Sequence, residues 1–191
     1  TEIGKIFAEN YSQKSETIWE LLWINLTCNS EICNWFACNI NYEKSYPKLE
    51  VETMMETTLS MYSGSVRKNA LGSLQNAFVS SPLGDKIHVG VITKENNKPV
   101  FSRISHDGIS LVALAYSLYR YAERKKRYSL NVSEFYDENQ TEGIFRQFGI
   151  SKDTLESLLL SLQEESNHVL RVELNMGLDN IILREDLTSV D

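Results

Sequence analysis

Twice along this chain, a helical pattern of apolar residues is followed directly by two short alternating segments that flank a turn. The helices span 66–80 and 152–165, the hairpins lie within 87–104 and 169–183, and residues 95–98 form the first hairpin's turn. Apolar residues at three- and four-residue spacing indicate a helix, whereas alternation indicates a strand with one buried face. Helix, short turn, helix and hairpin is the order of a winged helix. The sequence therefore predicts a mainly α fold with small β-hairpins (α+β), containing tandem winged-helix-like units.

The predicted elements divide the chain into three parts that pack as one compact assembly. Residues 1–48 form an N-terminal helical layer, residues 49–104 a first, basic winged-helix-like unit, and residues 105–191 a second, acidic one. Three tryptophans lie in the layer, Trp19, Trp23 and Trp35. We expect them to form a helical core rather than a base-stacking platform, because their surroundings are acidic. The chain opens at Thr1 without methionine, straight into a helical pattern at 1–10, which predicts a further segment before it.

The few basic residues gather in the middle of an acidic chain. Residues 65–128 hold eleven bases and four acids, a sum of +7, whereas residues 1–64 and 129–191 sum to −5 and −9. Together these sums give the net charge of −7. A local basic block can attract a polyanion even when the remaining surface repels it. The working hypothesis is therefore a face in the middle segment that binds DNA.

The candidate DNA-binding residues lie in three places. Two follow the expected cap Ser65 at the start of the 66–80 helix, four lie on or beside the first hairpin, and four lie near the end of a long helix at 108–126. They are Arg67, Lys68, Lys86, Lys94, Lys98, Arg103, Arg120, Arg124, Lys125 and Arg127. Recognition helices contact DNA through their N-terminal residues. The charges on the hairpin and those at the helix end can also have a purely structural role. Hairpin charges are often simply solvated, and cations in the last turn of a helix interact favourably with the helix dipole.

The sequence shows no catalytic constellation and no metal site. Its three histidines stand far apart without metal-binding spacing, and no glycine-rich loop could cradle a phosphate. No cofactor is evident, and Mg²⁺ would enter only if the protein is a nuclease. Cys28, Cys33 and Cys38 match neither a disulfide framework nor a zinc site, so we expect small buried residues in a reducing cytoplasm. No apolar run reaches membrane-spanning length, and no signal peptide is visible.

Several blocks of the chain resemble a known bacterial family. The stretch from Thr17 to Leu26, with Asn29 and Asn34-Trp35-Phe36 after it, is similar to the family's hallmark block, and Ser81-Pro82-Leu83 is similar to a later one. This SspB-like family of uncharacterised domains is encoded beside PAPS-reductase-like and ATPase proteins in DNA phosphorothioation and related phage-defence operons. The resemblance implies a DNA-engaging protein that contributes to strand nicking, with those operon proteins as partners. It transfers no catalytic position.

Two hypotheses follow from the sequence. In the first, the unit at 49–104 and the basic helix end at 120–127 grip backbone phosphates, with weak sequence readout because few side chains on the candidate helix can pair with bases. In the second, the protein is a non-enzymatic assembly factor whose acidic second unit docks a basic ATPase or sulfur-transfer partner. Winged helices serve in both ways, so the fold does not choose between them.

Overall fold

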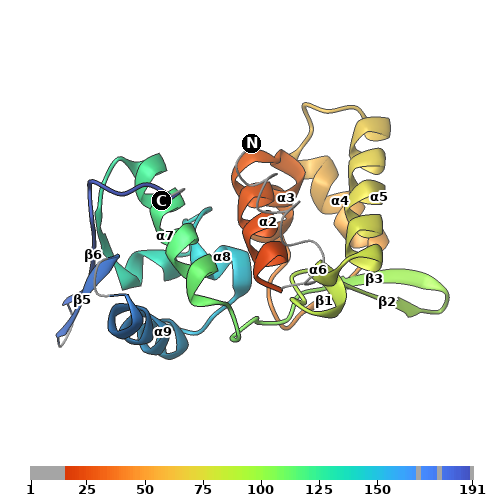
Figure 1. The fold of residues 1–191 in the computed structure, drawn as a ribbon. Helices are drawn as coiled ribbons and strands as arrows, with labels where there is room; N and C mark the ends of the chain where they lie inside the picture. Colours follow the sequence, from red (N-terminus) through yellow and green to blue (C-terminus); the bar gives the residue numbers. More distant parts are fainter. Residues whose placement is uncertain (1–15, 167–168, 176–177, 190–191) are drawn as a thin grey trace.

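The computed structural model describes residues 16–166, 169–175 and 178–189. Within them the chain is mainly helical with two small antiparallel sheets, which confirms the predicted α+β class (Figure 1). The helices are α2 (Glu16–Asn29), α3 (Glu31–Asn39), α4 (Lys48–Thr58), α5 (Gly64–Ser80), α6 (Pro82–Asp85), α7 (Leu111–Lys125), the 3-10 helix η2 (Val132–Tyr136), α8 (Ile144–Phe148) and α9 (Lys152–Glu165). The strands are β1 (Ser45–Pro47), β2 (Val91–Glu95), β3 (Lys98–Ser102), β4 (Ser129–Asn131), β5 (Leu170–Asn175) and β6 (Leu178–Leu183). The helix predicted at 1–10 lies outside the described residues.

The first sheet joins its strands in the order β1-β3-β2. Strands β2 and β3 form a hairpin whose turn residues, Asn96 and Asn97, have φ angles of 49° and 62°. A two-residue hairpin turn favours two successive residues in the left-handed region, and asparagine tolerates that region better than most residues. The turn predicted at 95–98 is thus confirmed. Strand β1 extends the sheet on the other edge of β3, where Tyr46 faces Phe101.

The second sheet repeats this arrangement in the order β4-β6-β5. We refer to residues 31–102 (α3 to β3) as the first lobe and to residues 111–183 (α7 to β6) as the second lobe. The sequence does not predict β1 or β4, because three residues are too few to show alternation and their pairing partners are distant along the chain. Strand β1 pairs with residues 100–102. A strand from the predicted N-terminal layer thus belongs to the same sheet as the hairpin of the first predicted unit.

Serine caps fix the starts of the main helices of each lobe. The Oγ atoms of Ser63, Ser110 and Ser151 each accept a hydrogen bond from the backbone N–H three residues further on, at the starts of α5, α7 and α9. Such a bond satisfies one of the N–H groups that a helix leaves without a partner in its first turn. The cap of α5 is Ser63 and not the expected Ser65, so this helix begins at Gly64.

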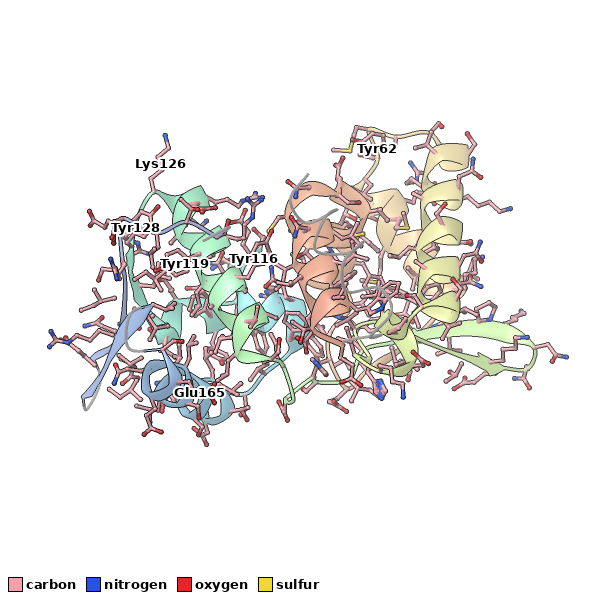
Figure 2. The ribbon with its side chains drawn as sticks, in the orientation of Figure 1. Tyr62, Tyr116, Tyr119, Lys126, Tyr128 and Glu165 are labelled. Atoms are coloured by element: carbon pink, nitrogen blue, oxygen red, sulfur yellow. The ribbon has the colours of Figure 1, made fainter. Side chains whose placement is uncertain are left out.

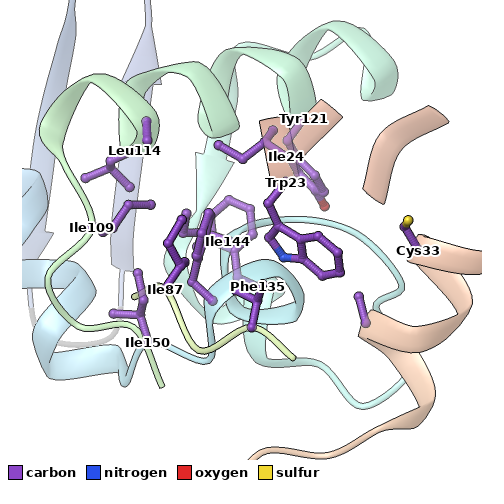
Figure 3. Close-up of a cluster of buried hydrophobic side chains, with 14 of the residues drawn as sticks. Trp23, Ile24, Cys33, Ile87, Ile109, Leu114, Tyr121, Phe135, Ile144 and Ile150 are labelled. Atoms are coloured by element: carbon purple, nitrogen blue, oxygen red, sulfur yellow. The ribbon is translucent and has the colours of Figure 1, made fainter. Parts of the chain in front are cut away.

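One continuous core of buried apolar residues joins the two lobes. Helix α2 lies between them and packs on α3 of the first lobe and on α7 and α8 of the second (Figure 1). Trp23 on α2 is fully buried, and its Nε1 donates to the Gln147 carbonyl at 2.8 Å. Figure 3 shows the Trp23 ring among aliphatic and aromatic side chains that include Ile144. Trp35 is also buried and Trp19 is partly buried against this core, which confirms the predicted tryptophan core.

Buried tyrosines should make the fold sensitive to alkali. Burial raises the pKa of Tyr121 to about 12, and it also raises the pKa values of Tyr42, Tyr116, Tyr119 and Tyr136. An unfolded tyrosine ionises near pH ~10, so above that pH the unfolded chain releases protons that the folded chain retains, and unfolding is favoured. We expect the urea midpoint to fall from about pH 10 upward. Tyrosinate absorbance should rise together with unfolding, and complete titration near pH ~10 in a folded protein would contradict this expectation.

Candidate nucleic-acid interface

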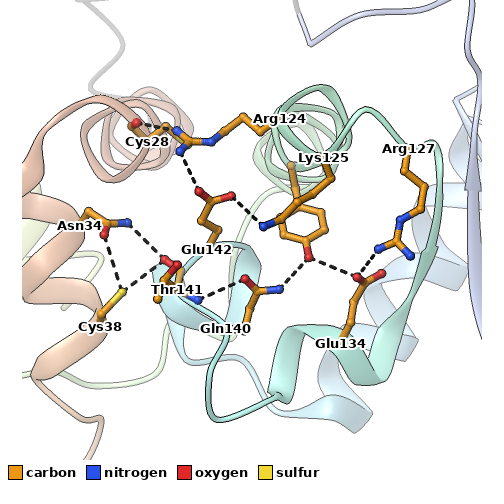
Figure 4. Close-up of polar contacts among 11 residues, drawn as sticks. Cys28, Asn34, Cys38, Arg124, Lys125, Arg127, Glu134, Gln140, Thr141 and Glu142 are labelled. Carbon is orange, nitrogen blue, oxygen red and sulfur yellow. Dashed lines mark hydrogen bonds and ion pairs between the residues drawn. The ribbon is translucent and has the colours of Figure 1, made fainter.

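The basic run at the C-terminal end of α7 is held by carboxylates (Figure 4). Arg124 Nη2 lies 2.7 Å from Glu142 Oε1, and Lys125 Nζ lies 3.7 Å from the other oxygen of the same carboxylate. Arg127 pairs with Glu134. Two carboxylates thus face three cations, so most of this positive charge is compensated within the protein, and a DNA phosphate would have to compete with a carboxylate for each cation.

The other two cations of this run are Arg120 and Lys126, and Arg124 makes a second contact. Arg120 Nη1 lies 3.6 Å from Glu123 Oε2, and Arg124 Nη1 donates to the Cys28 carbonyl on α2 at 2.6 Å. Lys126 ends α7 in the left-handed region, at a φ of 53°, and points away from the second lobe (Figure 2). The Arg124 contact connects α7 to α2. The basic run therefore has a structural explanation, as cations that stabilise a helix end and its contacts.

Arg103 is buried, with an exposed fraction of 1%, so the prediction that it contacts DNA is wrong. Its guanidinium donates to five backbone carbonyls, those of Ala37 (2.7 Å), Val89 (3.1 Å), Arg146 (2.7 Å), Gln147 (3.0 Å) and Ile40 (3.3 Å). Four of these carbonyls lie at the C-terminal ends of α3 and α8, where unpaired carbonyls carry partial negative charge. A guanidinium with five N–H donors suits this position, which joins the two lobes.

Arg67 also turns back onto the protein. Its Nη1 donates to the carbonyls of Leu59 and Tyr62, which lie at the end of α4 and in the turn before α5. Its Nη2 lies 4.0 Å from Glu56 Oε1. The side chain thus holds the α4–α5 turn, and we do not include it in the interface.

Four of the predicted residues form a solvent-facing set, which we call the lysine face: Lys68, Lys86, Lys94 and Lys98. They come from α5, from the residue after α6 and from both strands of the β2–β3 hairpin. Helix α5 and the hairpin lie at the outer edge of the first lobe, whereas α6 packs on α2 (Figure 1). All four are exposed, and in the part of the chain that the structure describes none of them forms an ion pair. Their charges are therefore available to an anionic partner.

The two hairpin lysines flank the turn on opposite faces of the β2–β3 ribbon. In the strand register Lys94 lies opposite Pro99, and Lys98 lies opposite Glu95. Because successive side chains of a strand point to opposite faces, Lys94 and Lys98 extend to different sides. A hairpin that enters a DNA groove meets one phosphate strand on each side, so this placement suits a backbone contact.

A buried acid that the sequence did not single out lies near the loop between the lobes. Glu20 on α2 is 1% exposed, and its carboxylate lies 2.7 Å from His106 Nε2. It also accepts hydrogen bonds from the Ser110 hydroxyl at 2.6 Å and from the Ser110 backbone N–H at 3.2 Å. The imidazole and the hydroxyl each contact this carboxylate, and among the described residues no hydrogen bond joins the two, so the pair lacks the contact by which a histidine takes a serine proton. The cluster holds the start of α7 against α2.

The described residues offer no evident metal site or reactive thiol. No group of three or more His, Cys, Asp or Glu side chains there could hold a metal ion, so they do not fit a bound Mg²⁺. Burial raises the pKa values of the three cysteine thiols, Cys28, Cys33 and Cys38, which disfavours thiolate chemistry. A small hollow beside Cys28, Glu142 and Arg146 has a volume of about 10 Å³, which is room for about one water molecule. In the described ranges no helix combines the length and apolar character needed to cross a bilayer.

Comparison with known proteins gives a likeness in fold. No protein-family model matches the chain, and no curated protein matches it either. Among solved structures, a magnesium-ion-bound SspB crystal structure is similar, with a TM-score of 0.64 and 11% sequence identity. The match covers 80% of this chain and 49% of SspB, so the chain spans about half the length of that protein. At this identity the likeness concerns the fold alone.

Proposed function

We propose that this chain is a DNA-engaging component of a phosphorothioation-type phage-defence system, and that its first lobe binds duplex DNA. The observation that carries the proposal is the lysine face, a set of exposed cations without carboxylate partners among the described residues. Helix α3, strand β1, helices α4 and α5, and the β2–β3 hairpin follow the element order of a winged helix, with the four-residue helix α6 inserted between α5 and the hairpin. We therefore propose that α5 acts as the recognition helix and the hairpin as the wing.

Charge asymmetry would orient the protein on DNA. Helix α5 contains no acidic residue, whereas α9, its counterpart in the second lobe, contains Asp153, Glu156, Glu164 and Glu165. Its one cation, Lys152, is paired with Asp179 at 2.6 Å and with Glu156 at 3.4 Å. A phosphate backbone would be attracted by the first helix and repelled by the second, so the first lobe faces the duplex.

The place of this chain in a defence system rests on two likenesses. Its tryptophan-containing block resembles the SspB-like family of phosphorothioation operons, and its fold is similar to that of SspB. The chain matches about half of that protein, and its described residues offer no Mg²⁺ site. We therefore assign it the holding of DNA. Strand nicking, which the resemblance implies, is proposed for the assembled system of this chain with its ATPase and PAPS-reductase-like partners.

A second candidate function is docking of a basic partner by the second lobe. The observation in its favour is Leu160, which is 44% exposed on α9, a helix whose exposed acids include Asp153 and Glu164. An apolar anchor with an acidic rim is a common form of protein contact surface. In that case the protein would be a non-enzymatic assembly factor for an ATPase or sulfur-transfer subunit, and DNA contact would be incidental.

Removal of the hairpin lysines should weaken DNA binding and its salt dependence. We expect Lys94→Ala and Lys98→Ala each to lower the affinity for duplex DNA several-fold and to reduce the slope of log affinity against log salt by about 1, because each loses one phosphate contact. Fluorescence anisotropy of labelled duplex over a salt series measures both quantities. Arg171→Ala is the control for a cation outside the first lobe, because it removes an equal charge from an exposed side chain that pairs with Glu173 at 2.6 Å.

Two results would change the proposal. If the protein does not bind duplex at low salt, the docking function of the second lobe is favoured. Arg124→Ala is expected to leave the salt slope unchanged, since Glu142 already compensates this cation. A reduced slope in that variant would show that the end of α7 also contacts DNA.

A further inference from the structure

The outward face of α5 carries amides and hydroxyls. Asn69, Ser73, Asn76 and Ser80 follow one another at intervals of four, three and four residues, so they line one face of the helix. All four are exposed. The opposite side of α5 is buried through Leu71, Leu74 and Phe78. Figure 1 shows α5 at the outer edge of the first lobe, with the β2–β3 hairpin beside its C-terminal end.

The side-chain amides of Asn69 and Asn76 make no hydrogen bond within the ranges that the structure describes. Other helical asparagines behave differently, because Asn25, Asn29 and Asn39 each donate to the carbonyl four residues earlier, at 2.9, 3.0 and 2.8 Å. A free amide presents a donor and an acceptor side by side, which is the pattern needed for a bidentate contact.

The surroundings of these amides favour nucleic acid as the partner. The 17 residues of α5 include no carboxylate that would repel phosphate, and Lys68 flanks the amide face one residue before Asn69. The hairpin lysines, Lys94 and Lys98, lie in the same lobe and are exposed as well. A polar helix face with a cation beside it is complementary to the major groove, which is lined by base donors and acceptors and bordered by phosphates.

We propose that α5 enters the major groove of duplex DNA and reads adenine through Asn69 and Asn76. Asparagine pairs bidentately with N6 and N7 of adenine, and no other base presents that combination. Residues seven apart lie about 10.5 Å apart along a helix axis, and base pairs stack about 3.4 Å apart, so the two adenines fall about three base pairs apart. The inference rests on the proposed DNA binding by the first lobe. It replaces the weak base readout that the sequence alone predicts for this helix, because the sequence did not show which helix face is exposed.

Selection from a random duplex library, with the whole chain, tests the inference. The unchanged protein should enrich adenine at two positions about three base pairs apart. Asn69→Ala and Asn76→Ala should each lose enrichment at one of these positions and bind the selected site roughly 5- to 150-fold more weakly. The salt slope and the affinity for unrelated duplex should stay unchanged. Both variants should fold, because alanine has a higher helix propensity than asparagine.

The outcomes separate this inference from the function on which it rests. Asn139→Ala, an exposed asparagine of the second lobe, is the matched control and should leave the selected sequence unchanged. Duplex binding without any base preference, or the same preference in both α5 variants, overturns the reading of adenine and leaves DNA binding in place. Absence of duplex binding at low salt overturns both.

Discussion

Arg103→Met is expected to lower the free energy of unfolding by about 3–5 kcal/mol. Methionine fills a similar volume but donates no hydrogen bond, so the carbonyls of Ala37, Ile40 and Val89 would lose the guanidinium donors that reach them. Each buried acceptor left unpaired costs about 1–3 kcal/mol, and local rearrangement would recover part of the sum. The Gln147 carbonyl would keep the Trp23 Nε1 donor, which limits the loss on the α8 side.

Urea unfolding measures this loss, and the substitution Arg171→Met provides its control. The Arg171 side chain is 73% exposed, so the same exchange of arginine for methionine should change stability by less than about 0.5 kcal/mol. Arg103→Lys should also destabilise, because one ammonium has three donors and cannot reach carbonyls spread over two helix ends and the approach to β2. A loss below about 1 kcal/mol for Arg103→Met would show that water or neighbouring donors replace the guanidinium.

The elements that the sequence predicts correctly are those with local signals. The turn at Asn96 and Asn97 is marked by residues that tolerate the left-handed region, and the helix around Trp23 is marked by apolar spacing. Strands β1 and β4 carry no such signal. Each has three residues and exists because a distant strand offers free backbone groups, so only the folded chain reveals it.

The candidate site likewise combines features that the sequence predicts with features that only the folded chain reveals. Charge counting located the segment that contains the lysine face, but it could not distinguish Lys94, which is exposed, from Arg103, which is buried. The partners of Arg103 are backbone carbonyls from segments far apart in sequence, and a carbonyl has no residue identity to recognise. Likewise, Arg124 is paired with Glu142 from the loop between η2 and α8, and Arg127 is paired with Glu134 on η2. The net charge of a segment therefore overstates the number of cations that are available to bind DNA.

Glu20 presents the opposite case to Arg103, a buried anion near a helix start instead of a buried cation at helix ends. Its carboxylate accepts from the Ser110 N–H and hydroxyl and contacts His106 Nε2. The Ser110 Oγ in turn accepts from the Ala113 N–H, so the acid orients the group that caps α7. This links α2 to the segment that connects the two lobes.

We expect Glu20→Leu to destabilise the protein by about 3 kcal/mol, because it leaves the partly buried Ser110 donors and His106 ring without their acceptor. Glu20→Gln keeps the shape and one acceptor, and should cost about 1–2 kcal/mol. Urea unfolding measures both, with Glu138→Leu, an exposed acid, as the control that should stay within about 0.5 kcal/mol. Combining Glu20→Leu with Ser110→Ala should cost less than the sum of the single changes, because both remove the hydrogen bond from the Ser110 hydroxyl to the carboxylate. A Glu20→Leu variant as stable as the unchanged protein would mean that desolvation of the carboxylate already cancels what its hydrogen bonds contribute.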